Sequence, residues 1–422
     1  MTPNPTPPAA ARPPLMPLDE ALARVLGFAQ PVLDEETVST FDADGRVLAR
    51  DVVAGLTVPP LDNSAMDGYA VRAADCVAPG AVLPVTQRIA AGSVGTPLAP
   101  GSAARIFTGA PIPPGADAVV MQEDTEPLDG GARVRIRTVP APGQSVRQAG
   151  EDIRRGRVIL QKGERLTPAS TGLAAGIGMS ELPVARRPRV ALLQTGDELV
   201  TPGTVAPQDM RPGMIYNSNR FFLRALLQRL GCEVVDHGVV LDDRAATVQA
   251  LQHAAEDSDL LLTSGGVSVG EEDHVKPAVQ QLGALDLWSI AIKPGKPFAY
   301  GHVRRVGGGA AHFIGLPGNP VSSFVTFVLL VRPFLLRLQG AAEVSLPAWP
   351  MRADFSITQP ERRREFLRVR RNAQGGLDLF ANQSSGVLTS VHWADGLVDL
   401  PPGATVAPGE MVRFIPMAEL LA

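Results

Sequence analysis

The sequence has few residues of several kinds, and each shortage excludes a class of protein. Its 422 residues contain only two cysteines, Cys76 and Cys232, and neither has a cysteine or histidine close to it. A disulfide framework and a cysteine-based zinc site are therefore not expected. Low cysteine content is also typical of a reducing compartment, so the expected location is the cytoplasm.

Positive charge and long apolar runs are scarce as well. The formal net charge is −4, whereas a general nucleic-acid binder carries a basic excess, so no nucleic acid is expected as a partner. The longest strongly apolar run, residues 324–331, stops at Arg332 and Pro333. A membrane-spanning helix needs about 20 such residues, so no membrane segment is expected. The N-terminus also lacks the charged and apolar regions of a secretory signal.

Proline and glycine, in contrast, are abundant. The chain holds 42 glycines and 39 prolines, well above average usage, which predicts many turns and β-rich segments. Residues 1–17 contain seven prolines and are expected to form a disordered tail, because proline cannot sustain a hydrogen-bonded element.

The order of sequence patterns predicts a multidomain α/β protein. An amphipathic helix is expected at 18–26, and short apolar runs broken by glycine and proline predict a β-rich domain at 61–142. A strand and a small-residue helix at 156–178 are expected to pack on the N-terminal helix. Segments 18–60 and 143–187 would then form one linking domain around the inserted β-rich domain.

Beyond residue 187 the pattern changes twice. Strand-like and helix-like segments alternate from 188 to 338, which is typical of a doubly wound parallel sheet. The segment ends with a strongly apolar helix, 320–338. Glycine-punctuated strands return at 341–422 and predict a C-terminal β-barrel.

Two motifs follow expected buried strands of the α/β domain. Residues 262–273 combine glycines with hydroxyls and then carboxylates, and residues 194–199 include Asp197 and Glu198. In an open α/β sheet, ligands bind beyond the carboxyl ends of the strands, where backbone N–H groups and carboxylates can hold phosphates and Mg²⁺. The alternatives are a tight turn for the first motif and a helix N-cap for the second.

Two further motifs carry groups suited to anions. Lys293 and Lys296 lie in a stiff, proline-containing loop, in a chain whose positive charge is mostly arginine. Residues 315–323 lead into the apolar helix with Ser322 near its start, where unpaired N–H groups favour an oxyanion. Solvated lysines and an ordinary helix cap are the alternatives.

Other polar segments are ambiguous when read from residue chemistry alone. Asp67 and the segments 107–113 and 150–154 read as turns. The arginine-rich segment 362–371 lacks interleaved aromatics, and it is interpreted as a solvated strand with one or two arginines facing an anion rather than as a nucleic-acid patch.

Taken together, these motifs resemble the molybdopterin molybdenumtransferase family, which includes the MoeA proteins and the E domain of gephyrin. The resemblance runs in order from about residue 15 to the C-terminus. It is carried by DNSAMDGYAV (62–71), RIFTGAPIPPGADAVVMQED (105–124), GEDIR (150–154), LLQTGDELV (192–200), IYNSN (215–219), LTSGGVSVGEED (262–273), AIKPGKPFAYG (291–301) and GLPGNPVSS (315–323).

The resemblance implies an enzyme of molybdenum cofactor biosynthesis. Such an enzyme inserts molybdenum from molybdate into adenylylated molybdopterin and releases AMP with the help of Mg²⁺. The family resemblance implies an elongated homodimer, with segments 18–60 and 143–187 as the dimerisation domain and 188–338 as the molybdopterin-binding domain. The active-site cleft would be shared between subunits. Transient partners would be the molybdopterin adenylyltransferase and apo-molybdoenzymes.

Site residues follow from the matching positions of the family's motifs. Positions tied to activity are Asp67, Thr108, Asp152, Glu198, Asp242, Asp273 and Lys293. Expected substrate contacts are Thr195, Ser264, Gly265, Gly266, Ser268, Pro317, Gly318, Asn319 and Pro320. Expected molybdate contacts are Lys293, Lys296, Ser322, Arg363 and Ser385, and expected metal ligands are Asp197, Glu198, Asp242 and Asp273. Ser289 departs from the family, whose members often carry lysine there.

Three competing functions are less consistent with the sequence. A molybdopterin adenylyltransferase would share the fold of 188–338 but would not need the flanking β domains. A non-enzymatic scaffold would need a long linker and a second fused domain, and a nucleic-acid regulator would need a basic excess.

Overall fold

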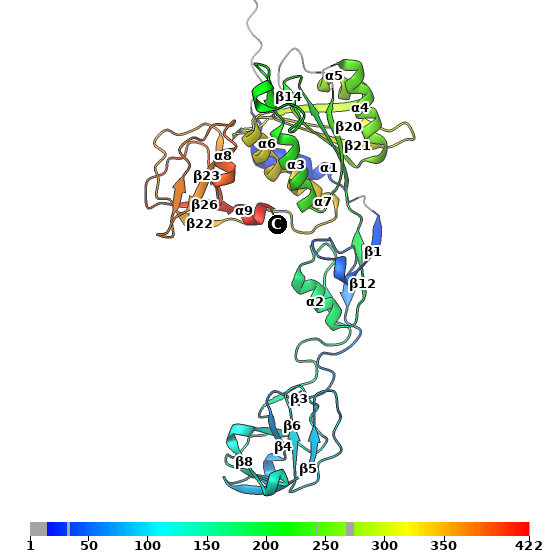
Figure 1. Cartoon of the computed structure of the whole chain (residues 1–422), viewed down its shortest axis with the longest axis vertical. Coiled ribbons are helices and arrows are strands. Elements are labelled where there is room, and N and C mark those ends of the chain that lie inside the picture. Colours follow the sequence, from blue (N-terminus) through cyan, green and yellow to red (C-terminus); the bar gives the residue numbers. More distant parts are fainter. Residues whose placement is uncertain (1–14, 32–33, 241–242, 267–273, 422) are drawn as a thin grey trace, which may run out of the picture.

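The computed structural model describes residues 15–31, 34–240, 243–266 and 274–421. The molecule is elongated, with an α/β domain and a C-terminal β domain side by side at one end (Figure 1). A narrow stalk leads from them to a separate β domain at the other end. The expected multidomain α/β fold, with a β-rich inserted domain and a C-terminal β-barrel, is confirmed.

The α/β domain is built on a six-stranded sheet with the strand order β16-β13-β17-β21-β20-β18. The strands are β13 (Arg189–Thr195), β16 (Glu233–Val240), β17 (Leu260–Ser264), β18 (Gly283–Ser289), β20 (Pro297–Arg304) and β21 (Ala310–Leu316). The pairs β16–β13, β13–β17 and β17–β21 are parallel, whereas β20 runs antiparallel to both β21 and β18. The sheet is therefore mixed rather than wholly parallel, because a short glycine-rich turn at 305–309 joins β20 directly to β21 in place of a helical crossover.

Helices cover both faces of this sheet. Along β13, Val190 and Leu192 pack on one side and Ala191 and Leu193 on the other, as the two-residue period of a strand requires. The first side carries α3 (Ser218–Arg229), and the second carries α4 (Arg244–Asp257) and α5 (Val275–Leu282). Apolar residues on both faces explain why the strand reads as a continuous apolar run.

The apolar segment 320–338 is a core element of the α/β domain. It comprises α6 (Pro320–Thr326), a π-helical turn (Phe327–Val331) and α7 (Arg332–Leu338). Within the described residues it is the one helix with the length and composition of a membrane span, and 94% of its most apolar 18-residue window is buried inside the protein. Pro333 lacks an N–H group and would clash with a preceding carbonyl of a regular helix, which accounts for the π-helical turn before it.

The N-terminal helix α1 (Leu18–Phe28) also belongs to this core. Its buried residues Leu18, Ala21 and Val25 join the cluster formed by α3 and α7. The expectation that the 156–178 segment packs on this helix is therefore wrong. That segment instead packs within the stalk, because the apolar face of α1 is already buried against the α/β domain.

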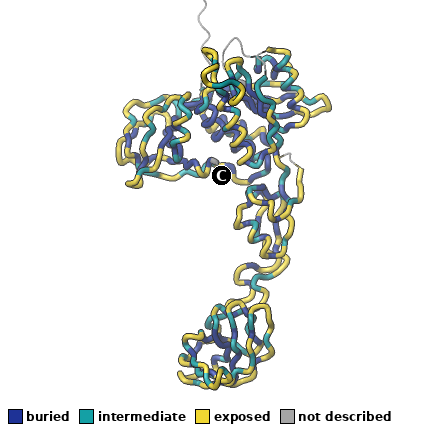
Figure 2. The backbone as a smooth tube through the Cα atoms, viewed as in Figure 1, coloured by how far each residue is buried: buried dark blue, intermediate teal, exposed yellow. Residues whose placement is uncertain are grey.

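The stalk is a small body with its own core. Strand β1 (Glu35–Ser39) pairs with β12 (Glu181–Ala185), and β2 (Val52–Val53) pairs with β11 (Val158–Leu160). Helix α2 (Pro168–Gly176) begins with a capping box between Thr167 and Ser170. Figure 2 shows that the two segments linking the stalk to the distal β domain are largely exposed.

The distal β domain is a six-stranded sheet with the order β7-β4-β6-β5-β9-β8. Its strands are β4 (Gly68–Val71), β5 (Ala81–Ile89), β6 (Ala103–Ile106), β7 (Ala118–Met121), β8 (Thr125–Leu128) and β9 (Arg133–Ile136). At its base β3 (Asn63–Ser64) pairs with β10 (Val146–Arg147). Apolar clusters fill both sides of the sheet.

The sheet of the C-terminal domain includes one strand, β19, that comes from the α/β segment of the chain. This sheet has the order β19-β23-β25-β26-β22, with β24 also paired to β23. The elements are β19 (Ile292–Lys293), β22 (Trp349–Arg352), β23 (Arg364–Arg371), β24 (Leu377–Leu379), α8 (Thr389–Trp393), β25 (Gly396–Leu400), β26 (Met411–Pro416) and α9 (Met417–Leu421). A bridge between Ala353 and Leu377 joins the two ends of this sheet and closes it as a barrel. Strand β19 lies between β18 and β20 in the chain.

An ion-pair network ties the barrel to helix α1. Asp399, with 3% of its side chain exposed, accepts two hydrogen bonds from Arg364, from Nε and Nη2, both at 2.6 Å. Arg364 also donates from Nη1 to Asp19 at 2.8 Å. The hydrogen bonds from Arg364 to Asp399 raise the pKa of this arginine.

We therefore expect Asp399→Ala to lower the free energy of unfolding by about 3 kcal/mol, because it leaves the partly buried guanidinium of Arg364 without its main counter-ion. Denaturant titration followed by far-UV circular dichroism measures this change. Asp378→Ala, which removes an exposed carboxylate from neighbouring β24, is the control and should change stability by less than about 0.5 kcal/mol. Equal effects of the two substitutions would contradict the assigned role of Asp399.

Candidate functional site

A cavity lies at the carboxyl ends of β13 and β17. The chain passes from β13 to β16 on one side and then to β17 on the other, so the strand order reverses between β13 and β17. Such a reversal leaves a crevice where open α/β sheets bind ligands. The cavity here has a volume of about 610 Å³, which is within the range of small-molecule sites.

Most expected substrate contacts of the α/β domain line this cavity. They come from the ends of β13 and β17 and from the loop between β21 and α6. The lining includes Thr195, Glu198, Ser264, Gly265, Gly266, Pro317, Gly318, Asn319, Pro320 and Ser322. Ser268, also expected as a substrate contact, lies outside the described residues.

Ser264 connects the elements that form the cavity. Its hydroxyl accepts a hydrogen bond from Asn219 Nδ2 at 2.8 Å and donates to the carbonyl of Pro317 at 3.1 Å. Asn219 Nδ2 also donates to the carbonyl of Gly318 at 2.7 Å. The end of β17, the first turn of α3 and the loop before α6 are therefore held together by buried hydrogen bonds.

The glycines after β17 are required by the local geometry. Gly265 and Gly266 have φ values of +97° and +66°, a region that side chains disfavour. A Cβ at Gly266 would lie 2.5 Å from Val275 Cγ2 and 3.0 Å from Thr195 Oγ1. The positive φ values of these two glycines are those that the turn interpretation requires, and both glycines also form part of the cavity wall.

Two buried amides of the cavity were not predicted as site residues. Gln194 and Asn217 are each 1% exposed and line the cavity. Asn217 Oδ1 caps α3 by accepting the N–H of Arg220 at 3.1 Å. Gln194 Nε2 and Asn217 Nδ2 have no hydrogen-bond partner among the described residues. These donors are suited to oxygen acceptors of a bound molecule, because an unpartnered buried donor is costly. For Asn217 the signal in the sequence was segment 215–219, which places two asparagines at the start of a helix, whereas Gln194 is the first residue of the 194–199 motif.

The carboxylates expected to bind a metal are only partly described. Asp197 and Glu198 follow β13 and are exposed. Asp242 and Asp273 lie outside the described residues. Within the described part of the chain, no group of three or more metal-ligating side chains is present.

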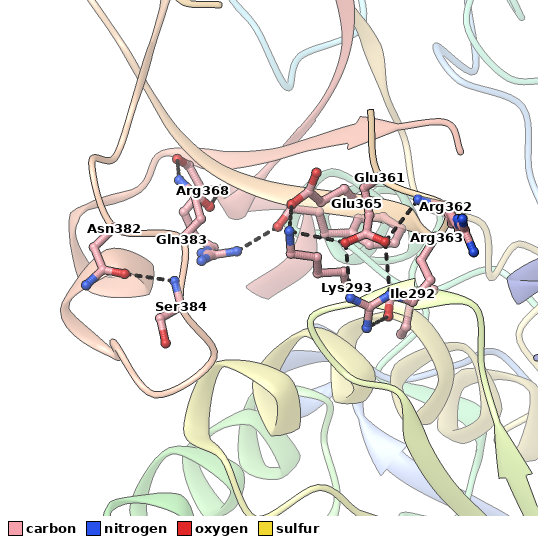
Figure 3. Close-up of polar contacts among 11 residues, drawn as sticks. Ile292, Lys293, Glu361, Arg362, Arg363, Glu365, Arg368, Asn382, Gln383 and Ser384 are labelled. Atoms are coloured by element: carbon pink, nitrogen blue, oxygen red, sulfur yellow. Dashed lines mark hydrogen bonds and ion pairs between the residues drawn. The ribbon is translucent and has the colours of Figure 1, made fainter. Parts of the chain in front are cut away.

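A cluster of charged residues lies where the barrel meets the α/β domain (Figure 3). Lys293 Nζ is 2.8 Å from Glu365 Oε1 and 3.3 Å from Glu361 Oε2. Arg363 Nη2 is 3.1 Å from the same oxygen of Glu361. The hydrogen bond to Glu365 raises the pKa of Lys293, and the hydrogen bond from Arg363 lowers the pKa of Glu361 to about 2. We call Lys293, Arg363, Glu361 and Glu365 the charged cluster.

The remaining expected molybdate contacts lie on segments around this cluster. Ser322 is buried in the first turn of α6. The carbonyl of Ser385 accepts the N–H of Val321 at 3.0 Å, and the neighbouring Gly386 lines the cavity. Lys296 is exposed. The barrel loop that carries Ser385 thus closes one side of the cavity.

The expected acidic residues of the first 155 positions lie far from this cavity within one chain. Asp67 precedes β4 in the distal β domain, and Asp152 lies near the junction of that domain with the stalk (Figure 1). Asp67 Oδ1 accepts the N–H and the hydroxyl of Thr108, both at 2.8 Å. The bond from the backbone N–H of Thr108 is the main cause of the lowered pKa of Asp67. The structure therefore joins Asp67 with Thr108 but separates both from Lys293 and Glu198.

Comparison with known proteins covers almost the whole chain. Residues 16–178 match the MoeA N-terminal region (domains I and II), residues 191–337 match a family described as a probable molybdopterin binding domain, and residues 350–417 match the MoeA C-terminal region (domain IV).

Curated relatives and solved structures agree with these matches. A molybdopterin molybdenumtransferase of Haemophilus influenzae is 41% identical over 79% of this chain and 80% of its own length. Molybdopterin molybdenumtransferase 2 of Mycobacterium tuberculosis is 40% identical over 93% and 96%, respectively. A crystal structure of the molybdopterin biosynthesis MoeA protein from Pyrococcus horikoshii covers 96% of this chain and all of its own, with a TM-score of 0.82 and 29% identity. The chain therefore belongs to the MoeA family of molybdopterin molybdenumtransferases, which are transferases.

Proposed function

We propose that this transferase of molybdenum cofactor biosynthesis inserts molybdenum from molybdate into adenylylated molybdopterin and releases AMP. The observation that carries the proposal is the cavity at the strand-order reversal, with neutral hydrogen-bond donors inside it and the charged cluster beside it. Adenylylated molybdopterin would occupy the cavity, where Gln194 and Asn217 offer their unpartnered amide N–H groups. Molybdate would bind next to it.

The donor types support molybdate as the second substrate. Molybdate is a tetrahedral dianion with hard oxygen atoms, and ammonium, guanidinium and hydroxyl groups are suitable donors for it. Lys293, Lys296, Ser322, Arg363 and Ser385 supply these groups from the α/β domain and the barrel. Loop 293–297 packs on α6, since a Cβ at Gly295 would lie 2.4 Å from Thr326 Oγ1. This packing brings the lysine loop close to Ser322 and the cavity.

Mg²⁺ is the proposed metal ion, with Asp197, Glu198, Asp242 and Asp273 as its proposed ligands. The chemistry of the set fits, because Mg²⁺ prefers carboxylate oxygens and retains several waters. When bound, Mg²⁺ would neutralise phosphate charge and favour departure of AMP. The chain's own contribution is to hold the phosphates at the carboxyl ends of β13 and β17, where Thr195 and Gly266 line the cavity.

The separation of the site residues supports a homodimer with a shared cleft. Asp67, Thr108 and Asp152 lie too far along the molecule to reach the cavity of their own chain (Figure 1). Large apolar side chains are exposed on the stalk and its junction with the distal β domain, namely Phe41, Val53, Leu56, Leu61 and Val158. A second copy of the chain would cover these side chains and bring its distal β domain to the cavity. We further propose a cytoplasmic location and transient contacts with the molybdopterin adenylyltransferase and apo-molybdoenzymes.

The reaction is tested with adenylylated molybdopterin, molybdate and Mg²⁺, by following AMP release and reconstitution of an apo-molybdoenzyme. AMP release that requires molybdate and yields active cofactor is the expected result. Consumption of ATP with molybdopterin alone would assign the chain to the adenylylation step instead. Silence in both assays would contradict an enzymatic role in either step.

Two neighbouring arginines test the molybdate site. Arg363→Ala should weaken molybdate binding about 10- to 100-fold, because one charge-assisted hydrogen bond contributes roughly 1.5–3 kcal/mol. Arg362→Ala is the matched control, since Arg362 is exposed and contacts Glu361 through its backbone N–H. Equilibrium dialysis with molybdenum quantification measures both. Similar losses in the two variants would argue against a specific role for Arg363.

Mixed dimers test the shared cleft. We expect Asp67→Asn and Lys293→Ala to inactivate the enzyme separately, and a refolded or co-expressed mixture to regain about a quarter of wild-type activity. The reason is that about half of randomly paired dimers contain both variants, and each of these has one intact site if the two residues meet across subunits. A matched mixture of Glu198→Gln and Lys293→Ala should stay inactive, because both residues belong to the same chain's site. Recovery in neither mixture, from dimers shown to contain both variants, would refute the shared cleft.

A further inference from the structure

The two cations proposed to bind molybdate already hold an anion of the protein itself. Glu361 Oε2 lies 3.3 Å from Lys293 Nζ and 3.1 Å from Arg363 Nη2. Its other oxygen lies 3.4 Å from Arg363 Nε and accepts the backbone N–H of Arg362 at 2.9 Å. One carboxylate thus bridges an ammonium, two nitrogens on one edge of a guanidinium and a backbone donor, as a bound oxyanion would (Figure 3).

The second carboxylate of the charged cluster has a different character. Glu365 lies on β23 directly opposite Lys293 of β19 in the sheet register, and 8% of its side chain is exposed. It also lies near the buried guanidinium of Arg368, whose pKa is lowered to about 10 by burial and raised in part by the charge of Glu365. Glu365 is therefore a fixed counter-ion of the folded barrel.

Glu361 is held less firmly than Glu365. It precedes β23 in an irregular segment, and its side chain is 24% exposed. Among the described residues the polar contacts of its carboxylate are with Lys293, Arg362 and Arg363, while its backbone carbonyl accepts the N–H of Gly403 at 2.7 Å. A carboxylate with such contacts can rotate away into solvent without breaking a sheet or opening a core. Removing such a partly exposed carboxylate from its partners costs less than removing a buried one, because water can hydrate it and its partners.

The net charge of the charged cluster determines which anions can replace Glu361. Lys293 and Arg363 carry two positive charges, and Glu361 and Glu365 carry two negative charges, so the cluster is neutral as it stands. If Glu361 leaves, the remaining cluster carries a net positive charge. The two cations then attract an incoming dianion more strongly than they attract a single carboxylate. A monoanion would gain no such advantage over Glu361.

We propose that Glu361 is an internal occupant of the oxyanion site, which molybdate must displace in order to bind. This inference rests on the proposed function, in which Lys293 and Arg363 bind molybdate. In the absence of substrate, Glu361 keeps the two cations paired and oriented. An anion must bind these cations more strongly than Glu361 does, which favours a doubly charged anion. Because Arg363 holds the pKa of Glu361 at about 2, displacement near neutral pH occurs by competition between anions and not by protonation.

The experiment measures binding of the molybdate ion alone to the full-length protein, by calorimetry or by equilibrium dialysis with molybdenum quantification. Glu361→Gln should lower the dissociation constant for molybdate by about fivefold or more, since it removes a competing charge from a partly exposed pair. Glu361→Ala, which removes the charge and also the hydrogen bonds, should tighten binding in the same direction. A thermal melt of each variant checks that it is folded.

The control is Asp378→Asn, which removes one negative charge from the same domain at an exposed position of β24. Its molybdate affinity should equal that of the wild type. Unchanged or weaker binding by folded Glu361 variants would overturn the proposal, and so would equal tightening by Asp378→Asn or failure of wild type and both Glu361 variants to bind molybdate. The AMP-release assay runs separately. Molybdate-dependent AMP release without tighter binding in the Glu361 variants would refute the occupant alone, whereas tighter binding without AMP release would refute the proposed reaction alone.

Discussion

The pairing of β19 with β23 is the contact on which the rest of the candidate site depends. Two residues of the α/β domain, Ile292 and Lys293, pair with Arg364 and Glu365 at the edge of the barrel sheet. Backbone hydrogen bonds fix both the position and the register of a strand pair. This short pairing therefore places Lys293 beside Glu365 and next to Arg363, although more than 60 residues separate them in the chain.

Two other contacts also hold the barrel against the α/β domain. The N–H of Val321 at the start of α6 donates to the carbonyl of Ser385 in the barrel loop, and Arg364 joins Asp19 of α1 to Asp399 of the barrel. The barrel is thus attached to the α/β domain through a strand edge, a helix start and an ion pair. Among the described residues the distal β domain has no comparable attachment, and the exposed segments that link it to the stalk separate it from the α/β domain (Figure 2). The fold therefore assembles one half of the expected site within a chain and leaves the other half at a distance.

Local patterns predicted the parts of this structure that depend on local physics. Strands β13 and β17 were visible because both of their faces are buried, so that each reads as a continuous apolar run. The cavity wall followed from glycines and hydroxyls after those strands. The partner of α1 was mispredicted because an apolar helix face does not specify which apolar surface it meets. The antiparallel direction of β20 depends on a short turn at 305–309. The alternation of strand-like and helix-like segments over 188–338 did not indicate that this connection lacks a helix.

The charged cluster shows a second kind of limit. Lys293 and Arg363 were expected as anion contacts, the lysine from its stiff loop and the arginine from the family resemblance. Their carboxylate partners Glu361 and Glu365 carried no signal, since acidic residues among arginines read as a solvated surface. Pairing across domains is decided by the register of β19 with β23. A sequence pattern of period two or 3.6 contains no information about that register.

Neutral hydrogen-bond donors and charged groups occupy different parts of the candidate site, and the cost of burying a charge explains this division. The buried part of the cavity wall presents neutral donors, the amide N–H groups of Gln194 and Asn217, which have no partner among the described residues. The full cations lie outside this lining, in the partly exposed charged cluster. An unpaired charge in an enclosed cavity would pay a desolvation cost of several kcal/mol, whereas an unpartnered amide costs about 1–3 kcal/mol. Neutral donors can therefore remain unpartnered in the cavity until an organic molecule binds. Lys293 and Arg363 instead need the carboxylate of Glu361 as a partner, which a doubly charged oxyanion replaces under the proposed displacement.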